Sequence, residues 1–226
     1  MVEFFCGNPG SGKSLHSAQV IREALERGDL VISNFEINVD IIKKCKNKDC
    51  FKYFNNDMLF APDIIIYTII EFFKDKNNKN KKVYVLLDEC QTMFDSRSWS
   101  VRGRKEWLNF FAQHRKYNTI KKFDNIHIIL ITQNIDTIDK RIRGLVEYRV
   151  EHTCITNIGN IGFLLKLFLR KNIFRANTYW NSQNSKNKID GYFFTPKKKY
   201  FEIYNTLNTF NIVDKGVSDS GRSTIL

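Results

Sequence analysis

The chain has 226 residues, of which 42% are hydrophobic and 14% aromatic, so it can bury a sizeable core and is not intrinsically disordered. The formal net charge of +12 favours an anionic partner, either nucleic acid or an acidic membrane surface, over a merely solvated basic surface. We expect neither a signal peptide nor a membrane-spanning helix, because the longest apolar run, 158–169, falls short of the ~18–20 residues that a span requires.

Short apolar runs alternate with amphipathic segments along the first 155 residues. Strands are predicted at Val2–Cys6, 30–32, Val83–Leu87, Ile126–Thr132 and 148–155, and helices at Lys13–Arg27, 64–73, 103–116 and 137–145. The polar segment 43–57 is expected to be a loop or a small insertion. This order predicts an α/β fold with a mainly parallel sheet sandwiched by helices, in which the carboxyl ends of the strands share one ligand-binding edge.

The alternation weakens after residue 156. We therefore divide the chain into a core, 1–156, a C-terminal extension, 157–213, and a disordered tail, 214–226. One or two strands are predicted over 192–204, and the polar segment 172–188 is assigned no element. The apolar segment 162–169 is either a patch that touches a membrane or a partner or, as we favour, a strand or helix in the core of the extension.

A glycine-rich segment follows the first predicted strand and precedes the first predicted helix. It has the pattern G-x-x-x-x-G-K-S and consists of Gly7, Asn8, Pro9, Gly10, Ser11, Gly12, Lys13 and Ser14. Its glycines free the backbone N–H groups to surround a β-phosphate at the positive N-terminus of the helix. Lys13 is expected to bind the β- and γ-phosphates and Ser14 to bind Mg²⁺. The segment therefore predicts a P-loop that binds ATP.

Two carboxylates follow the predicted strand Val83–Leu87. In P-loop enzymes an acidic residue at such a strand end holds the Mg²⁺ shell, and we assign this role to Asp88. A neighbouring carboxylate can act as the general base that polarises the attacking water, and Glu89 fits that role. The alternative is an ordinary acidic turn.

Polar and basic residues follow the predicted strand Ile126–Thr132. Gln133 could sense the γ-phosphate or position water, or could simply end the strand. Arg141 and Arg143 could serve as an arginine finger for a neighbouring subunit, with surface arginines as the alternative. Arg115 is a comparable candidate.

The motifs G-N-P-G-S-G-K-S, V-I-S-N, L-L-D-E-C-Q, F-A-Q-H-R-K-Y-N and I-L-I-T-Q-N-I-D-T-I-D-K-R-I-R follow one another in this order. Together they resemble the zonular occludens toxin (Zot) family, which includes the morphogenesis ATPase of filamentous phages. The resemblance covers about residues 1–155, with a fainter match over 199–206, K-Y-F-E-I-Y-N-T. It implies a RecA-like core related to the FtsK/HerA motor ATPases, so that 1–156 would be the ATPase core.

The resemblance also implies roles and partners. Lys13 and Ser14 would bind nucleotide and Mg²⁺, Asp88 and Glu89 would form the Walker B pair, Gln133 would be the sensor, and Arg143 is the better finger candidate. Family members act in the assembly and export of phage that carry single-stranded DNA, at the cytoplasmic face of the host inner membrane, as rings for which a hexamer is one arrangement. Phage DNA or coat proteins, and the membrane or a membrane protein, would be the partners. Members usually continue into a transmembrane helix, which we do not expect in this chain.

Three functions are compared. The leading hypothesis is an oligomeric ATPase that drives assembly and export of filamentous phage. The second is a nucleotide-gated assembly scaffold with little hydrolysis. A small-molecule kinase is less favoured, because no Arg-rich lid segment is evident and the pair Asp88–Glu89 indicates water as the acceptor.

Overall fold

The computed structural model describes residues 1–203 except 43, 46, 97–102, 115–124 and 182–187. Its strands are β1 (Val2–Cys6), β2 (Leu30–Ser33), β3 (Phe51–Tyr53), β4 (Val83–Leu87), β5 (Ile126–Thr132), β6 (Tyr148–Cys154), β7 (Phe174–Trp180) and β8 (Lys188–Phe194). Its α-helices are α1 (Lys13–Arg27), α2 (Asp63–Lys74), α3 (Arg104–Gln113), α4 (Lys140–Arg143), α5 (Gly159–Leu169) and α6 (Lys198–Phe201).

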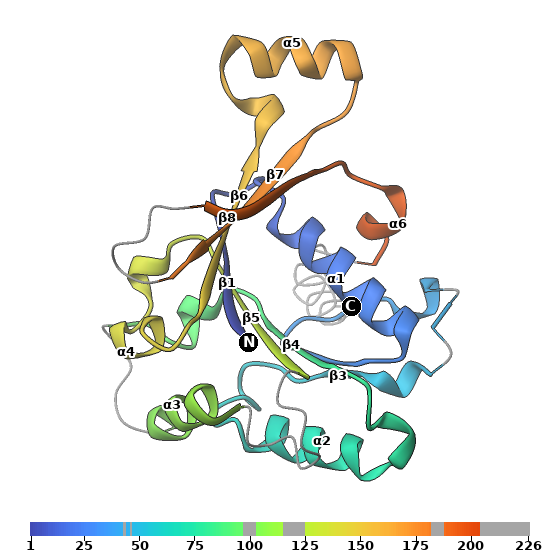
Figure 1. Ribbon diagram of the computed structural model, residues 1–226, viewed down its shortest axis with the longest axis vertical. Coiled ribbons are helices and arrows are strands. Elements are labelled where there is room, and N and C mark those ends of the chain that lie inside the picture. The colour runs from blue at the N-terminus through green and yellow to red at the C-terminus, as the bar shows by residue number, and fades with distance from the viewer. Residues whose placement is uncertain (43, 46, 97–102, 115–124, 182–187, 204–226) are drawn as a thin grey trace, which may run out of the picture.

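All eight strands join one sheet in the order β3-β2-β4-β5-β1-β6-β7-β8 (Figure 1). The strands from β3 to β6 run parallel, and β7 and β8 are antiparallel to their neighbours. The predicted α/β fold with a mainly parallel sheet is confirmed. The strand bounds of β1, β4 and β5 agree with prediction, because strands buried on both faces consist of continuous apolar runs.

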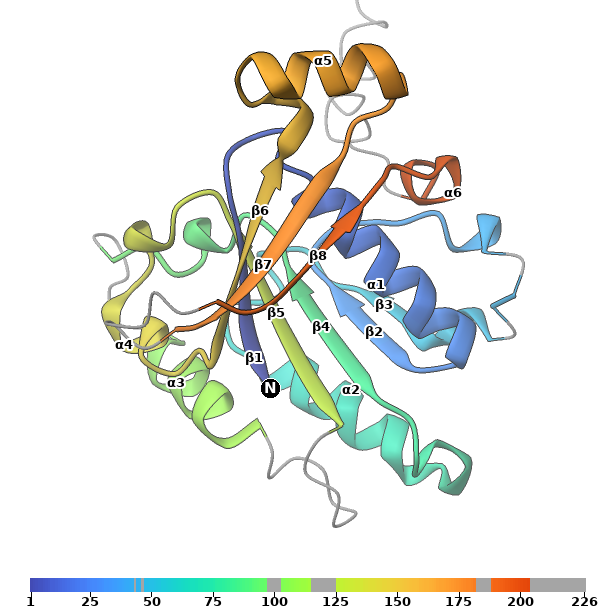
Figure 2. The same ribbon diagram turned by 45° about the horizontal axis from the view of Figure 1, so that its top comes forward.

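Alternate side chains of the central strands pack into two cores, one on each face of the sheet. On one face, strand residues such as Phe4, Val85 and Ile128 are buried together with residues from α2, α3 and α4, among them Ile69 and Trp107. On the other face, Phe5, Leu86 and Ile129 of the same strands are buried with Ile21, Ala24 and Leu25 of α1. Figure 2 shows α1 and α2 on opposite sides of the sheet. This two-residue period fixes the layers of the fold.

Several segments differ from prediction. The segment 192–204, predicted as one or two strands, contains the end of β8 and then the helix α6. The segment 43–57 contains the edge strand β3, which pairs with β2 from Val31↔Phe51 to Ser33↔Tyr53. The segment 172–188 contains β7, although its composition is polar. Strands at or near the end of a sheet face solvent on more sides, so their apolar pattern is weak and sequence reasoning misses them.

The extension and the core share the sheet, because β7 pairs with β6 along its whole length, from Tyr148↔Trp180 to Cys154↔Phe174. The division at residue 156 stays a proposal about which part carries the chemistry. The favoured interpretation of 162–169 as part of a core is wrong: these residues belong to α5, whose Leu164, Leu167 and Phe168 are exposed. Among the described residues, no helix is both long enough and apolar enough to span a bilayer.

Candidate active site

Three of the predicted site segments lie at the same edge of the sheet. The P-loop follows β1, Asp88 and Glu89 follow β4, and Gln133 follows β5. In the sheet β5 lies between β4 and β1, with Leu87 paired to Leu130 and Cys6 paired to Thr132. Because all three strands are parallel, their carboxyl ends carry these groups to one place. Gln133 therefore lies at the end of the strand between those that carry the P-loop and the pair of carboxylates.

The P-loop backbone depends on glycine at two close contacts. Gly7 has a φ of +141°, and a Cβ atom there would lie 2.5 Å from the carbonyl oxygen of His152. Gly12 has a φ of +101°, and a Cβ atom there would lie 2.6 Å from the ring of Phe174. The loop is thus held between β6 and β7 on one side and the start of α1 on the other. A side chain at either position would displace the backbone that is to surround a phosphate.

The side chain of Lys13 reaches back to the start of the P-loop. Its Nζ donates hydrogen bonds to the carbonyl oxygen of Gly7 at 2.6 Å and to that of Asn8 at 3.3 Å. Partial burial lowers the pKa of Lys13 from its usual range, whereas the charges of Asp88 and Glu89 act to raise it. The ammonium group is thus close to both carboxylates. Among the described residues its hydrogen bonds go to neutral carbonyls, which a phosphate oxygen can replace.

Asp88 is positioned by Asn34, a residue that sequence reasoning did not select. The backbone N–H of Asp88 donates to Oδ1 of Asn34 at 2.7 Å, and Nδ2 of Asn34 donates to the backbone oxygen of Asp88 at 2.9 Å. Asn34 directly follows β2, which pairs with β4. A polar side chain at the end of a buried strand was the available signal, and it is the same signal that identified Gln133.

Glu89 has a left-handed backbone with a φ of +47°, which is uncommon outside glycine and carries strain. Its side chain is exposed and accepts hydrogen bonds from two amides, that of Gln91 and, at 3.3 Å, that of Gln133. The structure therefore joins the predicted general base to the predicted sensor. Gln91 was assigned no role, although it belongs to the motif L-L-D-E-C-Q directly after the predicted strand.

Arg143 lies in α4 and borders the same region. Its guanidinium forms an ion pair with Asp136 at 2.8 Å. An open cleft of about 1270 Å³ is lined by P-loop residues 7–11, by Gln133 and Arg143, and by the face of β6 that carries Arg149 and Glu151. Arg143 therefore faces the cleft beside its own P-loop. Arg115 lies outside the described residues.

The donor set fits magnesium better than a transition metal. Ser14 and Asp88 offer oxygen atoms only, and in P-loop proteins a hydroxyl, a carboxylate, phosphate oxygens and water complete the Mg²⁺ shell. Among the described residues there is no group of three or more His, Cys, Asp or Glu that could hold a metal ion. Ser11 fits a ligand as well, because within the described part of the chain its buried Oγ has no hydrogen-bond partner.

Two buried histidines connect α1 to the strands beyond the P-loop. Nδ1 of His16 and Nε2 of His152 lie 2.8 Å apart, and the hydroxyl of Tyr192 contacts Nε2 of His16. Burial lowers the pKa of His16 to about 3 and that of His152 to about 4, so both are neutral near pH 7. The ring of His16 stacks on Phe5, with 4.5 Å between centroids. These contacts indicate a structural role for the pair.

The parallel sheet and the loop–helix junction at Gly7–Ser14 define the chain as a P-loop NTPase fold of the α/β class. A family model described as "Zonular occludens toxin (Zot)" matches residues 1–210. The chain therefore belongs to the zonular occludens toxin (Zot) family, and the resemblance found in its motifs is confirmed.

Several relatives are phage proteins. The chain is 26% identical over 230 residues to the Gene 1 protein of Enterobacteria phage M13, in an alignment that covers 96% of this chain and 62% of that protein. It is 26% identical over 148 residues to the Gene 1 protein of Salmonella phage IKe, covering 64% of this chain and 37% of that protein. The chain thus spans less than two thirds of the length of these relatives.

Two solved structures also resemble the fold. The N-terminal domain of zonular occludens toxin from Neisseria meningitidis has a TM-score of 0.47 and 17% identity, covering 90% of this chain and 98% of that chain. The genome packaging NTPase B204 from Sulfolobus turreted icosahedral virus 2, in complex with ATP-gammaS, has a TM-score of 0.45 and 14% identity, covering 82% of this chain and 95% of that chain.

Proposed function

We propose that the chain is an oligomeric ATPase that drives the assembly and export of filamentous phage. The observation that carries the proposal is the meeting of the P-loop, Asp88–Glu89 and Gln133 at the carboxyl ends of three adjacent parallel strands. A phosphate cradle, a magnesium ligand, a base and a water-positioning amide are the parts that hydrolysis of a nucleoside triphosphate needs.

The residues act together in one reaction. Lys13 leaves the carbonyls of Gly7 and Asn8 and binds the β- and γ-phosphates, while the loop N–H groups hold the β-phosphate. Glu89 accepts a proton from the water that attacks the γ-phosphorus, and Gln133 orients that water. The bond between the γ-phosphorus and the bridging oxygen breaks, giving ADP and phosphate. When bound, Mg²⁺ at Ser14 and Asp88 neutralises charge on the phosphates.

The phage role is supported by the relatives and by the charge of the chain. Gene 1 proteins of phages such as M13 align with nearly the whole chain. A net charge of +12 suits partners that carry phosphate groups, because basic side chains release counterions on contact with them. On this basis the chain acts as a homo-oligomeric ring on single-stranded phage DNA or coat proteins, at the cytoplasmic face of the host inner membrane.

Two substitutions test the nucleotide chemistry. Lys13→Ala should abolish ATP binding and turnover, and Glu89→Gln should lower turnover by about 10²-fold or more while ATP still binds. Turnover is measured by phosphate release with excess Mg²⁺, and binding by a fluorescent ATP analogue. The controls are Lys105→Ala and Glu106→Gln, exposed residues of α3 that leave the site untouched. Hydrolysis at wild-type rates in both site variants contradicts the catalytic assignment.

A nucleotide-gated scaffold is the second candidate, and the hydrogen bonds of Glu89 favour it. Both amides that contact Glu89 occupy the carboxylate oxygens that would have to accept a proton from the attacking water. If the chain is a scaffold, ATP binding alone should drive assembly, and neither single-stranded DNA nor coat protein should increase phosphate release. An increase with either one supports the motor instead.

A further inference from the structure

The helix α5 stands away from the rest of the protein, between the outer ends of β6 and β7 (Figures 1 and 2). It packs chiefly against the short turn that precedes it, Ile155–Asn157. Four of its apolar side chains are exposed, with exposed fractions of 60% for Leu164, 67% for Leu167, 91% for Phe168 and 46% for Leu169. By contrast, α2 buries the apolar face that contains Ile65 and Ile69.

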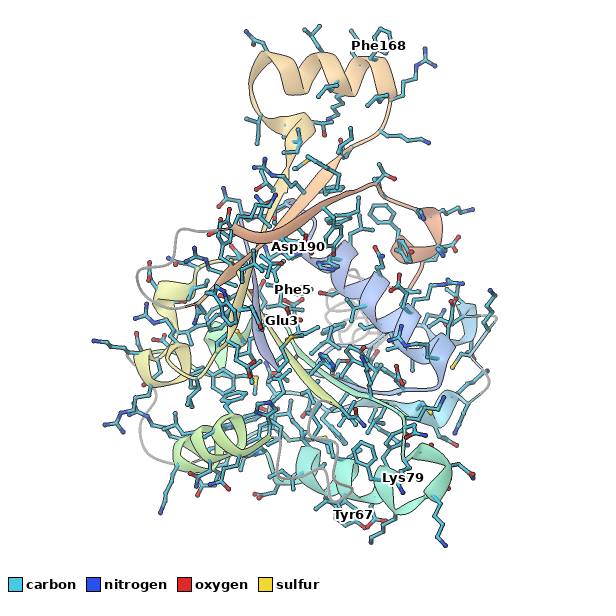
Figure 3. All side chains as sticks on the ribbon, viewed as in Figure 1. Glu3, Phe5, Tyr67, Lys79, Phe168 and Asp190 are labelled. Atoms are coloured by element: carbon cyan, nitrogen blue, oxygen red, sulfur yellow. The ribbon has the colours of Figure 1, made fainter. Side chains whose placement is uncertain are left out.

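The exposed side chains of α5 form a stripe. Leu164, Leu167 and Phe168 are three and four residues apart, so they share one face of the helix. Figure 3 shows Phe168 at the outer end of the molecule. An apolar stripe of this kind is unfavourable in water and marks a surface that contacts another apolar phase.

The charges around α5 are of one sign. The segment 152–189 contains no Asp or Glu, whereas Lys166, Arg170 and Lys171 lie on the helix or directly after it and are exposed. A partner that fits must therefore combine an apolar layer with negative charge next to it. Anionic lipid headgroups above acyl chains have this arrangement.

The length of α5 sets how it can meet a bilayer. Its 11 residues extend over about 16 Å, roughly half the thickness of the hydrocarbon layer, so the helix cannot cross it. It can lie in the plane of the surface, with the leucine and phenylalanine side chains below the headgroups and the long cationic side chains reaching the phosphates.

We propose that α5 docks the protein on an anionic lipid bilayer, with Leu164, Leu167 and Phe168 inserted and Lys166, Arg170 and Lys171 at the headgroups. A second copy of the chain fits this face poorly, because it would bring the same acid-free, cationic segment against itself. The inference deepens the membrane contact in the proposed function, and it is independent of nucleotide hydrolysis.

Vesicle flotation tests the proposal with the 226-residue chain. The protein should float with vesicles of phosphatidylglycerol and phosphatidylcholine and much less with phosphatidylcholine alone. The double variant Leu167→Ser/Phe168→Ser should weaken binding about tenfold or more, since each side chain loses its transfer out of water. Tyr67→Ser is the matched control, because Tyr67 is 64% exposed on α2 at the opposite end of the molecule, and it should bind like the wild type (Figure 3).

The charges are tested separately. Lys166→Gln and Lys171→Gln should each weaken binding about fivefold at low salt, the share of one cation near an anionic surface. This difference should shrink at high salt, where the headgroup charges are screened, whereas the effect of the apolar double variant should persist.

Four outcomes overturn the proposal. These are no binding to anionic vesicles, equal binding of the double variant and the wild type, equal binding to neutral and anionic vesicles, and self-association or protein capture that needs α5 while vesicles do not bind.

The double variant should retain the wild-type melting temperature and ATP binding, which shows that its loss of vesicle binding is a local effect. Lys13→Ala should still float, so failure of the nucleotide assignment and failure of the lipid assignment give different results.

Discussion

At the scale of single residues, the site is shaped by contacts between the P-loop and side chains that are distant in sequence. Phe174 lies against Gly12, the carbonyl oxygen of His152 lies against Gly7, and Asn34 holds the backbone of Asp88. None of the three belongs to a motif that binds nucleotide directly. They hold the binding groups in place, so changes at these contacts should alter nucleotide chemistry without removing a ligand.

Gly12→Ala should destabilise the protein more than Gly10→Ala. Both positions have a positive φ, which costs about 1–2 kcal/mol for a residue with a Cβ atom. The new methyl group at Gly12 would in addition overlap the ring of Phe174, whereas no atom of the described residues lies within 4 Å of a Cβ atom at Gly10. Urea unfolding of the ATP-free proteins measures both changes. Equal losses of stability would contradict the packing of Phe174 on the loop.

Acidification should destabilise the fold between pH 6.5 and pH 5. The pKa of His16 falls from 6.5 to about 3 on folding and that of His152 to about 4, both chiefly through burial. Below pH 6.5 the unfolded chain therefore binds more protons than the folded chain, and unfolding is favoured. His127, with its pKa lowered to about 4, acts in the same direction.

Glu3 opposes this trend. Burial raises the pKa of Glu3 from 4.5 to about 7, so as the pH falls Glu3 is protonated in the folded chain before it is protonated in the unfolded chain. This proton uptake stabilises the folded chain and offsets the destabilising effect of about one histidine. The net expectation is a loss of about 1 kcal/mol or more per pH unit. Urea unfolding at pH 7.5, 6.5 and 5.5 measures it, and His16→Gln should flatten the slope. A stability that is constant or rises on acidification is incompatible with the buried neutral pair.

At the scale of elements, β6 and β7 link the nucleotide site to the proposed lipid-binding helix α5. His152 of β6 and Phe174 of β7 contact the P-loop, and α5 connects the outer ends of these two strands. The strand pair is antiparallel and fully registered over seven residues, so it forms a stiff connection between the two. The extension therefore contributes a residue, Phe174, that contacts the candidate site.

Phe174→Ala should weaken both the fold and the nucleotide site. Phe174 is 6% exposed and packs on Gly12 and on Phe194, so its removal should cost about 3 kcal/mol or more and should lower ATP affinity. Phe193→Ala on β8 is the control: Phe193 is 66% exposed, and its loss should change stability by less than about 0.5 kcal/mol. Thermal unfolding and analogue binding measure the two effects. Wild-type ATP affinity in a folded Phe174→Ala protein would show that β7 does not support the nucleotide site.

At the scale of the whole molecule, the open cleft beside the P-loop bears on oligomerisation. Its lining includes P-loop residues 7–11 and Arg143, so a neighbouring subunit seated there would contact the nucleotide. Arg143 borders this cleft and pairs with Asp136 in this single chain, so a subunit contact at the cleft would include Arg143.

Arg143→Ala should lower turnover by about 10³-fold while ATP still binds, as expected for an arginine finger. Arg141→Ala is the matched control, because Arg141 is an exposed arginine of the same helix. Mass photometry with an ATP analogue should show a ring in the wild type. If the chain stays monomeric with the analogue, or if both variants behave alike, Arg143 is not an intersubunit finger.

The sequence by itself determined which residues are the candidates for the site and which central strands carry them. The P-loop spacing, the carboxylates after Val83–Leu87 and Gln133 after Ile126–Thr132 are local patterns, because a buried parallel strand is a continuous apolar run that ends where its ligand-binding residue begins. The bounds of β1, α1, β4 and β5 followed from the same local signals, and motif order led to the family.

Only the tertiary structure decided which distant residues serve that chemistry. The contacts of Asn34 with Asp88 and of Phe174 with Gly12 join segments more than 50 residues apart, and they depend on strand order and register, which local periodicity does not encode. The same holds for α5: its composition alone suited a core, and only the placement of β6 and β7 showed that nothing in the described chain covers its apolar stripe.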